Sequence, residues 1–187
     1  MVRIAVIVAN KSEDVETVVP VDIWRRAGII VKLISIEKKK NVILAHGTKI
    51  SCDEILAKEN LSKYNAIYLP GGEGHLRFND VDSPRLISFL NKYGKNPKIV
   101  FMAMCAAPEV FGGLGMLNSV KFTCYQGYEK NFKKTYENKD VVVDKNFITA
   151  KSLAYTIPFA LAGVNKLLKK ATAENVAKEI CYTGKII

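Results

Sequence analysis

The sequence predicts a doubly wound α/β protein, in which a mostly parallel central sheet carries helices on both faces. Two observations support this prediction. The segments typical of strands, such as "RIAVIVA" (residues 3–9) and "IVFMAM" (residues 99–104), are continuous apolar runs that suit strands buried on both faces. These runs alternate along the chain with segments whose apolar residues recur at helical spacing, which favours parallel strands joined by helices.

The first helix is expected directly after the first strand, in "EDVETVVPVDIWRRAG" (residues 13–28). Ser12 or Asp14 is the expected N-cap, because short polar side chains satisfy the free N–H groups of a first turn. Gly28 is expected to end the helix, since glycine tolerates the left-handed conformation that follows many helices. Pro20 lies inside the pattern and predicts a kink or a restart.

The later elements are predicted by the same apolar runs, turn residues and helical spacing. Strands are expected at residues 29–36, 65–70, 98–104 and 119–124, and hairpins at residues 42–51 and 141–150. Helices are expected from residue 84, after the capping candidates Asp82 and Ser83, to residue 93, and at residues 155–170 and 173–181.

The composition is that of a globular protein. The chain has 187 residues, 49% hydrophobic and 25% charged, which fits one domain over residues 1–187 with a substantial core. Its apolar N-terminal run is too short to cross a bilayer, and we expect a cytoplasmic protein with no membrane contact. The formal charge of +10 suggests nucleic acid as one partner. The lysines are scattered, however, which favours a solvated basic surface instead.

The four cysteines are Cys52, Cys105, Cys124 and Cys181, and none forms a CxxC pair. With only two histidines, the chain shows no zinc-ligand spacing, so we expect no metal and no cofactor. Cytosolic thiols are normally reduced, so each cysteine is either a core residue or a reactive group. Cys52 and Cys124 are expected to be core or interface thiols.

Cys105 stands where a buried strand is followed at once by small residues and a proline, in "MCAAPEVFGG". A sharp strand-to-helix turn pushes its junction residue out over the sheet, which is the arrangement of a nucleophile elbow. A helix N-terminus beneath the sulfur would lower the pKa of the thiol. The alternative interpretation is a small buried hydrophobic residue at the end of a strand.

Two further features are expected at the same edge of the sheet. Gly71 and Gly72 follow a strand, and their N–H groups could stabilise an oxyanion, although a plain turn also explains a glycine pair. Glu16 lies early in the first helix, where it could reach the thiol. Burial and a nearby thiolate would then keep its carboxyl protonated. The alternative for Glu16 is a solvated acid that interacts with the helix dipole.

Three sequence blocks carry a resemblance to a known family: "EDVETVVPVDIWRRAG", "IYLPGGEG", and "MCAAPEVFGGLGML" followed by "KFTCYQGYE". Their order and spacing, along nearly the whole chain, resemble the DJ-1/ThiJ/PfpI superfamily. The chain is most similar to the branch of the parkinsonism-associated protein deglycase and its bacterial ThiJ-like relatives. The resemblance implies a flavodoxin-like sandwich and a homodimer.

The resemblance also implies roles for particular residues. Cys105 would be the nucleophile on a strained elbow, and Glu16 its protonated carboxylic-acid partner. The backbone N–H groups of Gly72 and Ala106 would donate to an oxyanion, and Gly71 would shape or complete that oxyanion hole. No metal or organic cofactor is implied.

Three departures from the family pattern bear on activity. The protease-like branch has a histidine directly after the cysteine, where this chain has Ala106, so a Cys–His peptidase dyad is absent. The parkinsonism-associated branch has a histidine where this chain has Tyr125. The glycine-rich loop "RGPGT" of the family is matched by "KSLAYT" (residues 151–156). Tyr125 and Tyr155 are therefore candidate pocket residues. Because these positions differ from the family pattern, the family's substrate cannot be transferred to this chain.

The sequence therefore leads to two main hypotheses. The first is cysteine-dependent detoxification of small 2-oxoaldehydes, as a glutathione-independent glyoxalase or a protein deglycase. The second is an oxidative-stress sensor or redox-regulated chaperone that acts through oxidation of Cys105. His75, which follows "GGEG", is expected to be a surface histidine, with an approach to the cleft as the alternative.

Overall fold

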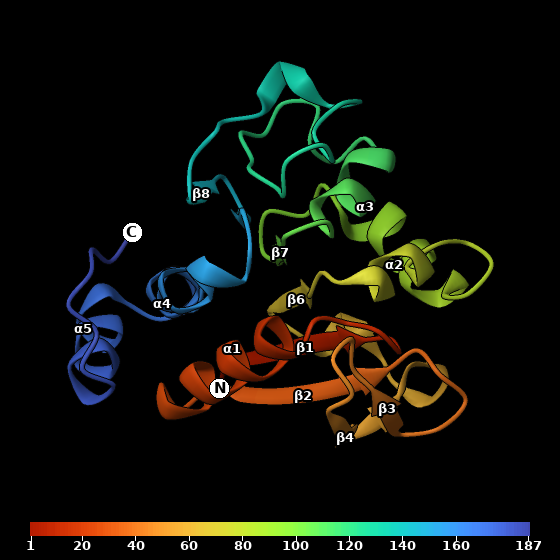
Figure 1. Cartoon of the computed structure of the whole chain (residues 1–187), viewed down its shortest axis with the longest axis horizontal. Helices are drawn as coiled ribbons and strands as arrows, with labels where there is room; N and C mark the ends of the chain where they lie inside the picture. Colours follow the sequence, from red (N-terminus) through yellow and green to blue (C-terminus); the bar gives the residue numbers. More distant parts are fainter.

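The computed structural model of the chain describes residues 1–187 and shows a seven-stranded central sheet with helices on both faces (Figure 1). The strand order is β5-β2-β1-β6-β7-β9-β8, and all neighbours are parallel except β8 and β9. The strands are β1 (Arg3–Val8), β2 (Ile30–Ser35), β5 (Glu54–Ile55), β6 (Ala66–Leu69), β7 (Val100–Met104), β8 (Val141–Asp144) and β9 (Phe147–Ala150). The expected doubly wound α/β fold is confirmed.

The helices divide between the two faces of the sheet. One face is covered by α1 (Asp14–Arg26), α4 (Thr156–Leu167) and α5 (Lys170–Glu179), and the other by α2 (Pro84–Tyr93) and α3 (Pro108–Gly113) (Figure 1). The remaining elements are the hairpin β3 (Asn41–Ile43) and β4 (Lys49–Ser51), and the 3-10 turns η1 (Leu56–Lys58), η2 (Leu61–Lys63), η3 (Glu73–Arg77), η4 (Lys133–Thr135) and η5 (Leu153–Tyr155).

Each face of the sheet has its own hydrophobic core. Along β1, Ile4 and Val6 pack into the core beneath α1 and α4, whereas Ala5 and Ile7 pack into the core beneath α2 and α3. Side chains alternate between the two faces of a strand, so a strand buried on both faces needs apolar residues at every position. This is why the strand runs in the sequence are continuous rather than alternating.

The topology places the loops after three strands around one crevice. The chain passes from β1 to β2 on one side and then returns to β6 on the other side of β1, which makes the β1–β6 boundary a switch point. Ligands of open α/β sheets bind outside the carboxyl ends of the strands at such a point. The segments that carry Glu16, Gly71 and Cys105 follow β1, β6 and β7 respectively.

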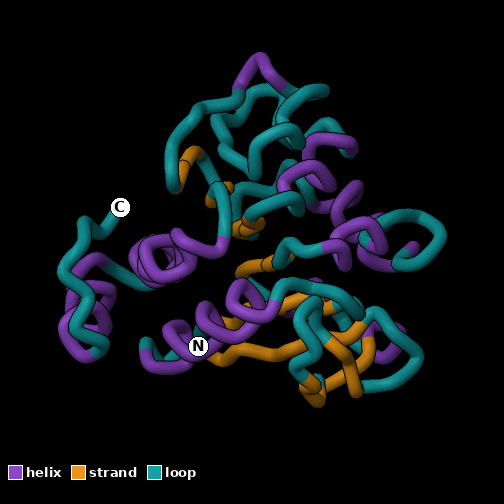
Figure 2. The backbone as a smooth tube through the Cα atoms, in the orientation of Figure 1, coloured by secondary structure: helices purple, strands orange, loops and turns teal.

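The strand expected at residues 119–124 does not form. Only Phe122 makes an isolated bridge, to Tyr136, and the segment between α3 and β8 is mostly loop (Figure 2). The Thr123 N–H instead donates to the side-chain oxygen of Thr149 at 2.9 Å. A side chain on β9 therefore takes the place of a backbone ladder, and the apolar residues of this segment are buried without a strand.

The start of α1 also differs from the expectation. Glu13, rather than Ser12 or Asp14, is the N-cap, and its carboxylate accepts a hydrogen bond from the Glu16 N–H at 2.7 Å. A carboxylate at this place satisfies a free N–H group and faces the positive end of the helix dipole. The helix neither breaks nor restarts at Pro20, which lies inside one continuous element.

Other boundaries follow the expectation closely. Gly28 lies just past the end of α1 at a φ of 78°, as expected of a glycine after a helix. Ser83 precedes α2, but its hydroxyl donates to backbone carbonyls instead of capping the helix. The helix expected from residue 155 begins at Thr156, directly after the 3-10 turn η5, and α5 begins three residues earlier than expected.

Candidate active site

Cys105 occupies a strained corner between β7 and α3. Its φ is 57°, in the left-handed region that non-glycine residues rarely adopt. The backbone on both sides holds this conformation: the Cys105 N–H donates to the Ala150 carbonyl at 2.9 Å, and the Cys105 carbonyl accepts from the Tyr125 N–H at 2.8 Å. Such strain costs about 1–3 kcal/mol and is typical of functional sites. The structure therefore has the geometry of a nucleophile elbow.

Small residues make this corner possible. Ala106 and Ala107 are both buried, and Pro108 begins α3. The helix that follows has only six residues, however. It is therefore a much weaker source of positive potential beneath the sulfur than the helix expected from the sequence.

Gly71 lies between the two side chains of interest. A Cβ atom added to Gly71 would lie 2.6 Å from the Cβ of Cys105 and 2.7 Å from Oε2 of Glu16. Any larger residue would push the two side chains apart. The Gly71 N–H donates to Oε2 of Glu16 at 2.8 Å. It is thus occupied, and the interpretation of Gly71 as an oxyanion donor is wrong for this arrangement.

Gly72 and Ala106 present their N–H groups to the sulfur. Hydrogen bonding by these two groups lowers the pKa of Cys105, and no backbone carbonyl accepts from either. Gly72 has a φ of 78°, and a Cβ there would lie 2.5 Å from the Glu13 nitrogen. Only glycine therefore allows the loop after β6 to approach the start of α1 so closely.

Glu16 is fully buried at the same place. Burial raises the pKa of its carboxyl to about 7, the Gly71 N–H opposes that shift, and the charge of Glu13 adds to it. Oε2 accepts from Gly71, whereas Oε1 has no hydrogen-bond partner in the protein. The expectation of a carboxyl that retains its proton near neutral pH agrees with this environment, and a free oxygen remains to carry that proton.

Two residues that hold Glu16 were missed at the level of sequence. The Glu13 carboxylate accepts from the Glu16 N–H, and the hydroxyl of Tyr68 on β6 donates to the Glu16 carbonyl at 2.9 Å. Glu13 stands three residues before Glu16, a spacing typical of caps. Tyr68 is the one polar side chain in the strand "AIYL", which is the signal that could have drawn attention to it.

The thiol does not have the lowered pKa expected of it. Burial, followed by the charge of Glu16, raises the pKa of Cys105 to about 12 against the opposing N–H groups of Ala106 and Gly72. Two acidic groups that share one buried place cannot both ionise easily. Over the range between these two values the Cys105–Glu16 pair therefore holds a single negative charge, which lies on the carboxylate while the proton stays on the sulfur.

The two tyrosines named as pocket candidates lie differently. Tyr125 is 50% exposed, and its N–H bonds the Cys105 carbonyl, so it stands next to the elbow. Tyr155 lies on η5, where a hydrogen bond to Asp140 raises the pKa of its hydroxyl. No hydrogen bond joins Tyr155 to Cys105. The structure thus brings Tyr125 to the site through its backbone and directs the Tyr155 hydroxyl elsewhere.

His75 is buried, which contradicts the expectation of a surface histidine. Its Nδ1 lies 2.7 Å from the Gly72 carbonyl, its Nε2 lies 3.5 Å from the Glu109 carboxylate, and its ring meets Tyr128 edge-on. Because a carbonyl only accepts, Nδ1 carries the proton. His75 therefore braces the loop that presents the Gly72 N–H, and it packs under that loop instead of facing solvent.

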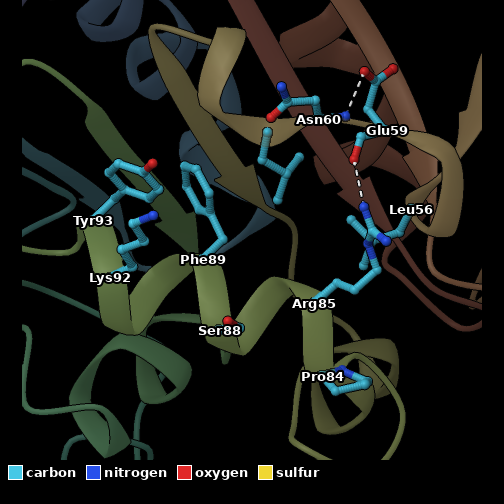
Figure 3. A pocket seen from close by; sticks show the side chains of 10 residues that line it. Leu56, Glu59, Asn60, Pro84, Arg85, Ser88, Phe89, Lys92 and Tyr93 are labelled. Atoms are coloured by element: carbon cyan, nitrogen blue, oxygen red, sulfur yellow. Dashed lines mark hydrogen bonds between the residues drawn. The ribbon is translucent and has the colours of Figure 1, made fainter.

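A separate cavity of about 580 Å³ lies between α2 and the η1–η2 segment. Figure 3 shows Phe89 and Tyr93 on α2 at one side and Leu56 and Glu59 at the other. Its lining includes neither Cys105 nor Glu16, nor any residue of the loop after β6. The cavity is therefore distinct from the elbow.

No cluster of three or more histidine, cysteine, aspartate or glutamate side chains is arranged to hold a metal ion. None of the helices is long and apolar enough to cross a bilayer. Cys52 and Cys124 are buried, as expected of core thiols, and Cys181 is exposed.

A cysteine on a strained strand-to-helix corner, at the switch point of a doubly wound sheet and beside a buried acid, defines the class of α/β proteins with a cysteine nucleophile elbow. Within that class, the chain belongs to the DJ-1/PfpI family, whose sequence pattern matches residues 2–166. This family includes glyoxalases, deglycases and proteins of the oxidative-stress response. The resemblance drawn from the sequence blocks is confirmed.

Relatives and solved structures agree with this assignment. The chain is 29% identical to Protein dj-1beta of Drosophila melanogaster over 92% of this chain and 93% of the relative. It is 31% identical to YraA of Bacillus subtilis (strain 168), over 80% and 89%, a protein named only provisionally as a cysteine protease. The oxidized DJ-1 of Toxoplasma gondii superposes with a TM-score of 0.93 at 28% identity, covering 98% of this chain and all of that one.

The buried acid predicts an unusual pH dependence of stability. Because folding raises the pKa of Glu16 from 4.5 to about 7, the folded state carries a penalty that is absent below pH 4.5, grows between those values and is complete above pH 7. Glu16→Gln removes the penalty. We expect its free energy of unfolding, relative to wild type, to improve by about 3 kcal/mol between pH 4 and pH 8.

Urea denaturation at the two pH values measures this difference. Glu59→Gln is the control with the opposite sign. Burial raises the pKa of Glu59, but hydrogen bonds from Lys63 and Asn60 lower it below its ordinary value overall. Loss of the Glu59 carboxylate in Glu59→Gln should therefore lower the free energy of unfolding at pH 8. If the difference in free energy of unfolding between Glu16→Gln and wild type did not change with pH, burial of the Glu16 charge would not destabilise the fold.

The strain at Cys105 gives a second prediction. Cys105→Ala keeps a Cβ at a φ of 57°, whereas Cys105→Gly removes it. We expect the glycine variant to be more stable than the alanine variant by about 1 kcal/mol, because relief of left-handed strain exceeds the entropy cost of glycine. Thermal and urea unfolding of both variants measure the difference, and an alanine variant that is the more stable of the two would refute the strain.

Proposed function

We propose that the chain converts small 2-oxoaldehydes such as methylglyoxal into 2-hydroxy acids, as a glutathione-independent glyoxalase. The observation that carries this proposal is the buried Glu16 carboxyl held beside Cys105 at a strained elbow. A carboxyl with a pKa of about 7 is matched to proton transfer at neutral pH. Membership of a family that includes glyoxalases and deglycases supports the proposal.

In the first step, Glu16 takes the thiol proton as the Cys105 sulfur bonds to the aldehyde carbon. The carbonyl oxygen becomes an oxyanion, for which the N–H groups of Gly72 and Ala106 are the donors. Protonation of that oxygen by Glu16 gives a hemithioacetal. Covalent attachment fixes the remaining carbonyl beside the same carboxyl, so the next proton transfers are intramolecular.

In the second step, Glu16 removes the proton from the carbon bonded to sulfur and returns it to the adjacent carbon through an enediol. The product is a thioester of the 2-hydroxy acid, which water hydrolyses to release the acid and restore the thiol. The sum is one 2-oxoaldehyde plus one water giving one 2-hydroxy acid, with no external oxidant or reductant. Oε1, which has no partner in the protein, is the proposed proton carrier.

Deglycation of proteins or thiols uses the same attack on a carbonyl adduct and belongs to the same proposal. Peptidase activity does not, because Ala106 occupies the place of the histidine that such a dyad needs. His75 offers no substitute, since its Nδ1 bonds Gly72 and its Nε2 faces Glu109. The homodimer, the cytoplasmic location and the absence of a nucleic-acid partner remain predictions from the sequence.

The proposal is tested by measuring lactate formation from methylglyoxal with wild type, Cys105→Ala, Glu16→Gln and the control Cys181→Ala. We expect Cys105→Ala to lose activity and Glu16→Gln to lose at least about a hundredfold, the usual scale for a general acid–base. For wild type, kcat/KM should rise with pH through about 7, where Glu16 ionises. Equal rates for wild type and Cys105→Ala would reject the proposal.

A second candidate function is sensing of peroxide by oxidation of Cys105. The structure that superposes with a TM-score of 0.93 is an oxidized DJ-1 from Toxoplasma gondii, which favours this candidate. A thiolate attacks peroxide to give a sulfenate and water, so that the sulfur is oxidised as the peroxide is reduced. The N–H groups of Gly72 and Ala106 and a protonated Glu16 are suitable donors to the new oxygen.

Graded peroxide followed by peptide mass spectrometry tests the sensor. Cys105 should oxidise before the exposed Cys181, because the N–H groups of Gly72 and Ala106 stabilise a thiolate at Cys105. Glu16→Gln should keep this order, because its amide can still donate a hydrogen bond to the new oxygen. Oxidation of Cys181, Cys52 or Cys124 before Cys105 would contradict a sensing role.

A further inference from the structure

Pro20 leaves the carbonyl of Glu16 without its helical partner. In an α-helix each carbonyl accepts from the N–H four residues later, and the residue four after Glu16 is Pro20, which has no N–H. Glu16 is fully buried, so water cannot take this place. An unpaired buried carbonyl is costly, and a partner from elsewhere in the fold is required.

The hydroxyl of Tyr68 is that partner. It donates to the Glu16 carbonyl at 2.9 Å from β6, on the strand next to β1. The tyrosine is completely buried, and its ring meets Trp24 edge-on at 5.2 Å and packs at a tilt against Phe159 at 5.3 Å. Its hydroxyl therefore has one position, fixed by the core.

Glu16 is consequently held at three points. Its N–H donates to Glu13, its carbonyl accepts from Tyr68, and its Oε2 accepts from Gly71. Tyr68 and Gly71 stand three residues apart on the same strand and the loop that leaves it. One polar atom of Glu16, Oε1, stays free of the protein.

We propose that Tyr68 and Pro20 form a positioning pair: the proline vacates the Glu16 carbonyl so that the Tyr68 hydroxyl anchors the helix backbone at Glu16 to β6, beside the loop that carries Gly71. This positioning role rests on the proposed function, in which Glu16 carries the proton. Tyr68 acts through Glu16 and does not touch the sulfur or the substrate.

The proposal has a directional consequence for titration. The Gly71 N–H lowers the pKa of Glu16 against the larger effect of burial. If the backbone of Glu16 loses its anchor, the bond from Gly71 to Oε2 lengthens and this lowering effect weakens. The first proton of the Cys105–Glu16 pair then leaves at higher pH. Loss of ring packing or of overall stability has no such consequence.

The test compares Tyr68→Phe, Pro20→Ala and the double variant, with Tyr64→Phe as matched control. Tyr64 has a buried hydroxyl with no hydrogen-bond partner, so its removal changes a hydroxyl without changing an anchor. The readout is the rate of Cys105 alkylation by iodoacetamide against pH, followed by mass spectrometry of the Cys105 peptide. The first rise of this rate follows the ionisation of Glu16, because the carboxylate can then take the thiol proton. This readout needs no carbonyl turnover.

We expect the midpoint of the alkylation profile to rise by about half to one pH unit in Tyr68→Phe and to stay at the wild-type value in Tyr64→Phe. Pro20→Ala supplies an N–H four residues after Glu16, so the double variant should regain the wild-type midpoint. In methylglyoxal turnover, Tyr68→Phe should lower kcat about tenfold with little change in KM, and the double variant should recover it.

A Tyr68→Phe midpoint equal to that of Tyr64→Phe overturns the positioning role, even if the variant is less stable. A Tyr68→Phe/Pro20→Ala variant that keeps the shifted midpoint also overturns the positioning role. The shift would then not arise from the loss of a hydrogen bond to the Glu16 carbonyl. Absence of lactate formation by wild type would reject the proposed function alone, since the alkylation profiles would still test the anchor.

Discussion

The structure depends on how one negative charge is accommodated in a buried place. Cys105 and Glu16 each titrate as weak acids there, and burial opposes the ionisation of both. Three backbone N–H groups oppose that cost: Gly71 at the carboxyl, and Gly72 and Ala106 at the sulfur. They are sufficient for a single charge and insufficient for two. A buried carboxylate that can take the thiol proton, rather than a strongly acidic thiol, is what makes the site suitable for acid–base chemistry.

The fold provides these N–H groups through close backbone contacts. Parallel strands β1, β6 and β7 end at the same edge, and the loop after β6 touches both the start of α1 and the corner after β7. Glycine at positions 71 and 72 allows contacts that a Cβ would prevent. His75 braces this loop from below through the Gly72 carbonyl. Strain at Cys105 is the cost of aiming the sulfur at the same point.

The chain shares its overall fold with members of the family, whereas the departures from the family pattern were drawn from the sequence. A cysteine-to-alanine mutant of the DJ-1 superfamily protein STM1931 from Salmonella typhimurium superposes with a TM-score of 0.88 at 27% identity, over 98% of this chain and all of that one. The overall fold is therefore shared. Ala106, Tyr125 and the "KSLAYT" segment are the departures that the sequence already showed, and they bear on the substrate rather than the fold.

The sequence by itself determined the main strands and helices and the elbow, but it also predicted a strand at residues 119–124 that does not form. Continuous apolar runs, a cysteine before small residues and a glycine pair are local signals, and their physical causes are local burial and backbone freedom. The tertiary structure alone decided how the polar atoms pair. Gly71 donates to a side chain 55 residues away, and Tyr68 to a carbonyl 52 residues away. Such pairings depend on which loops meet at the switch point, and burial then leaves each atom few alternatives.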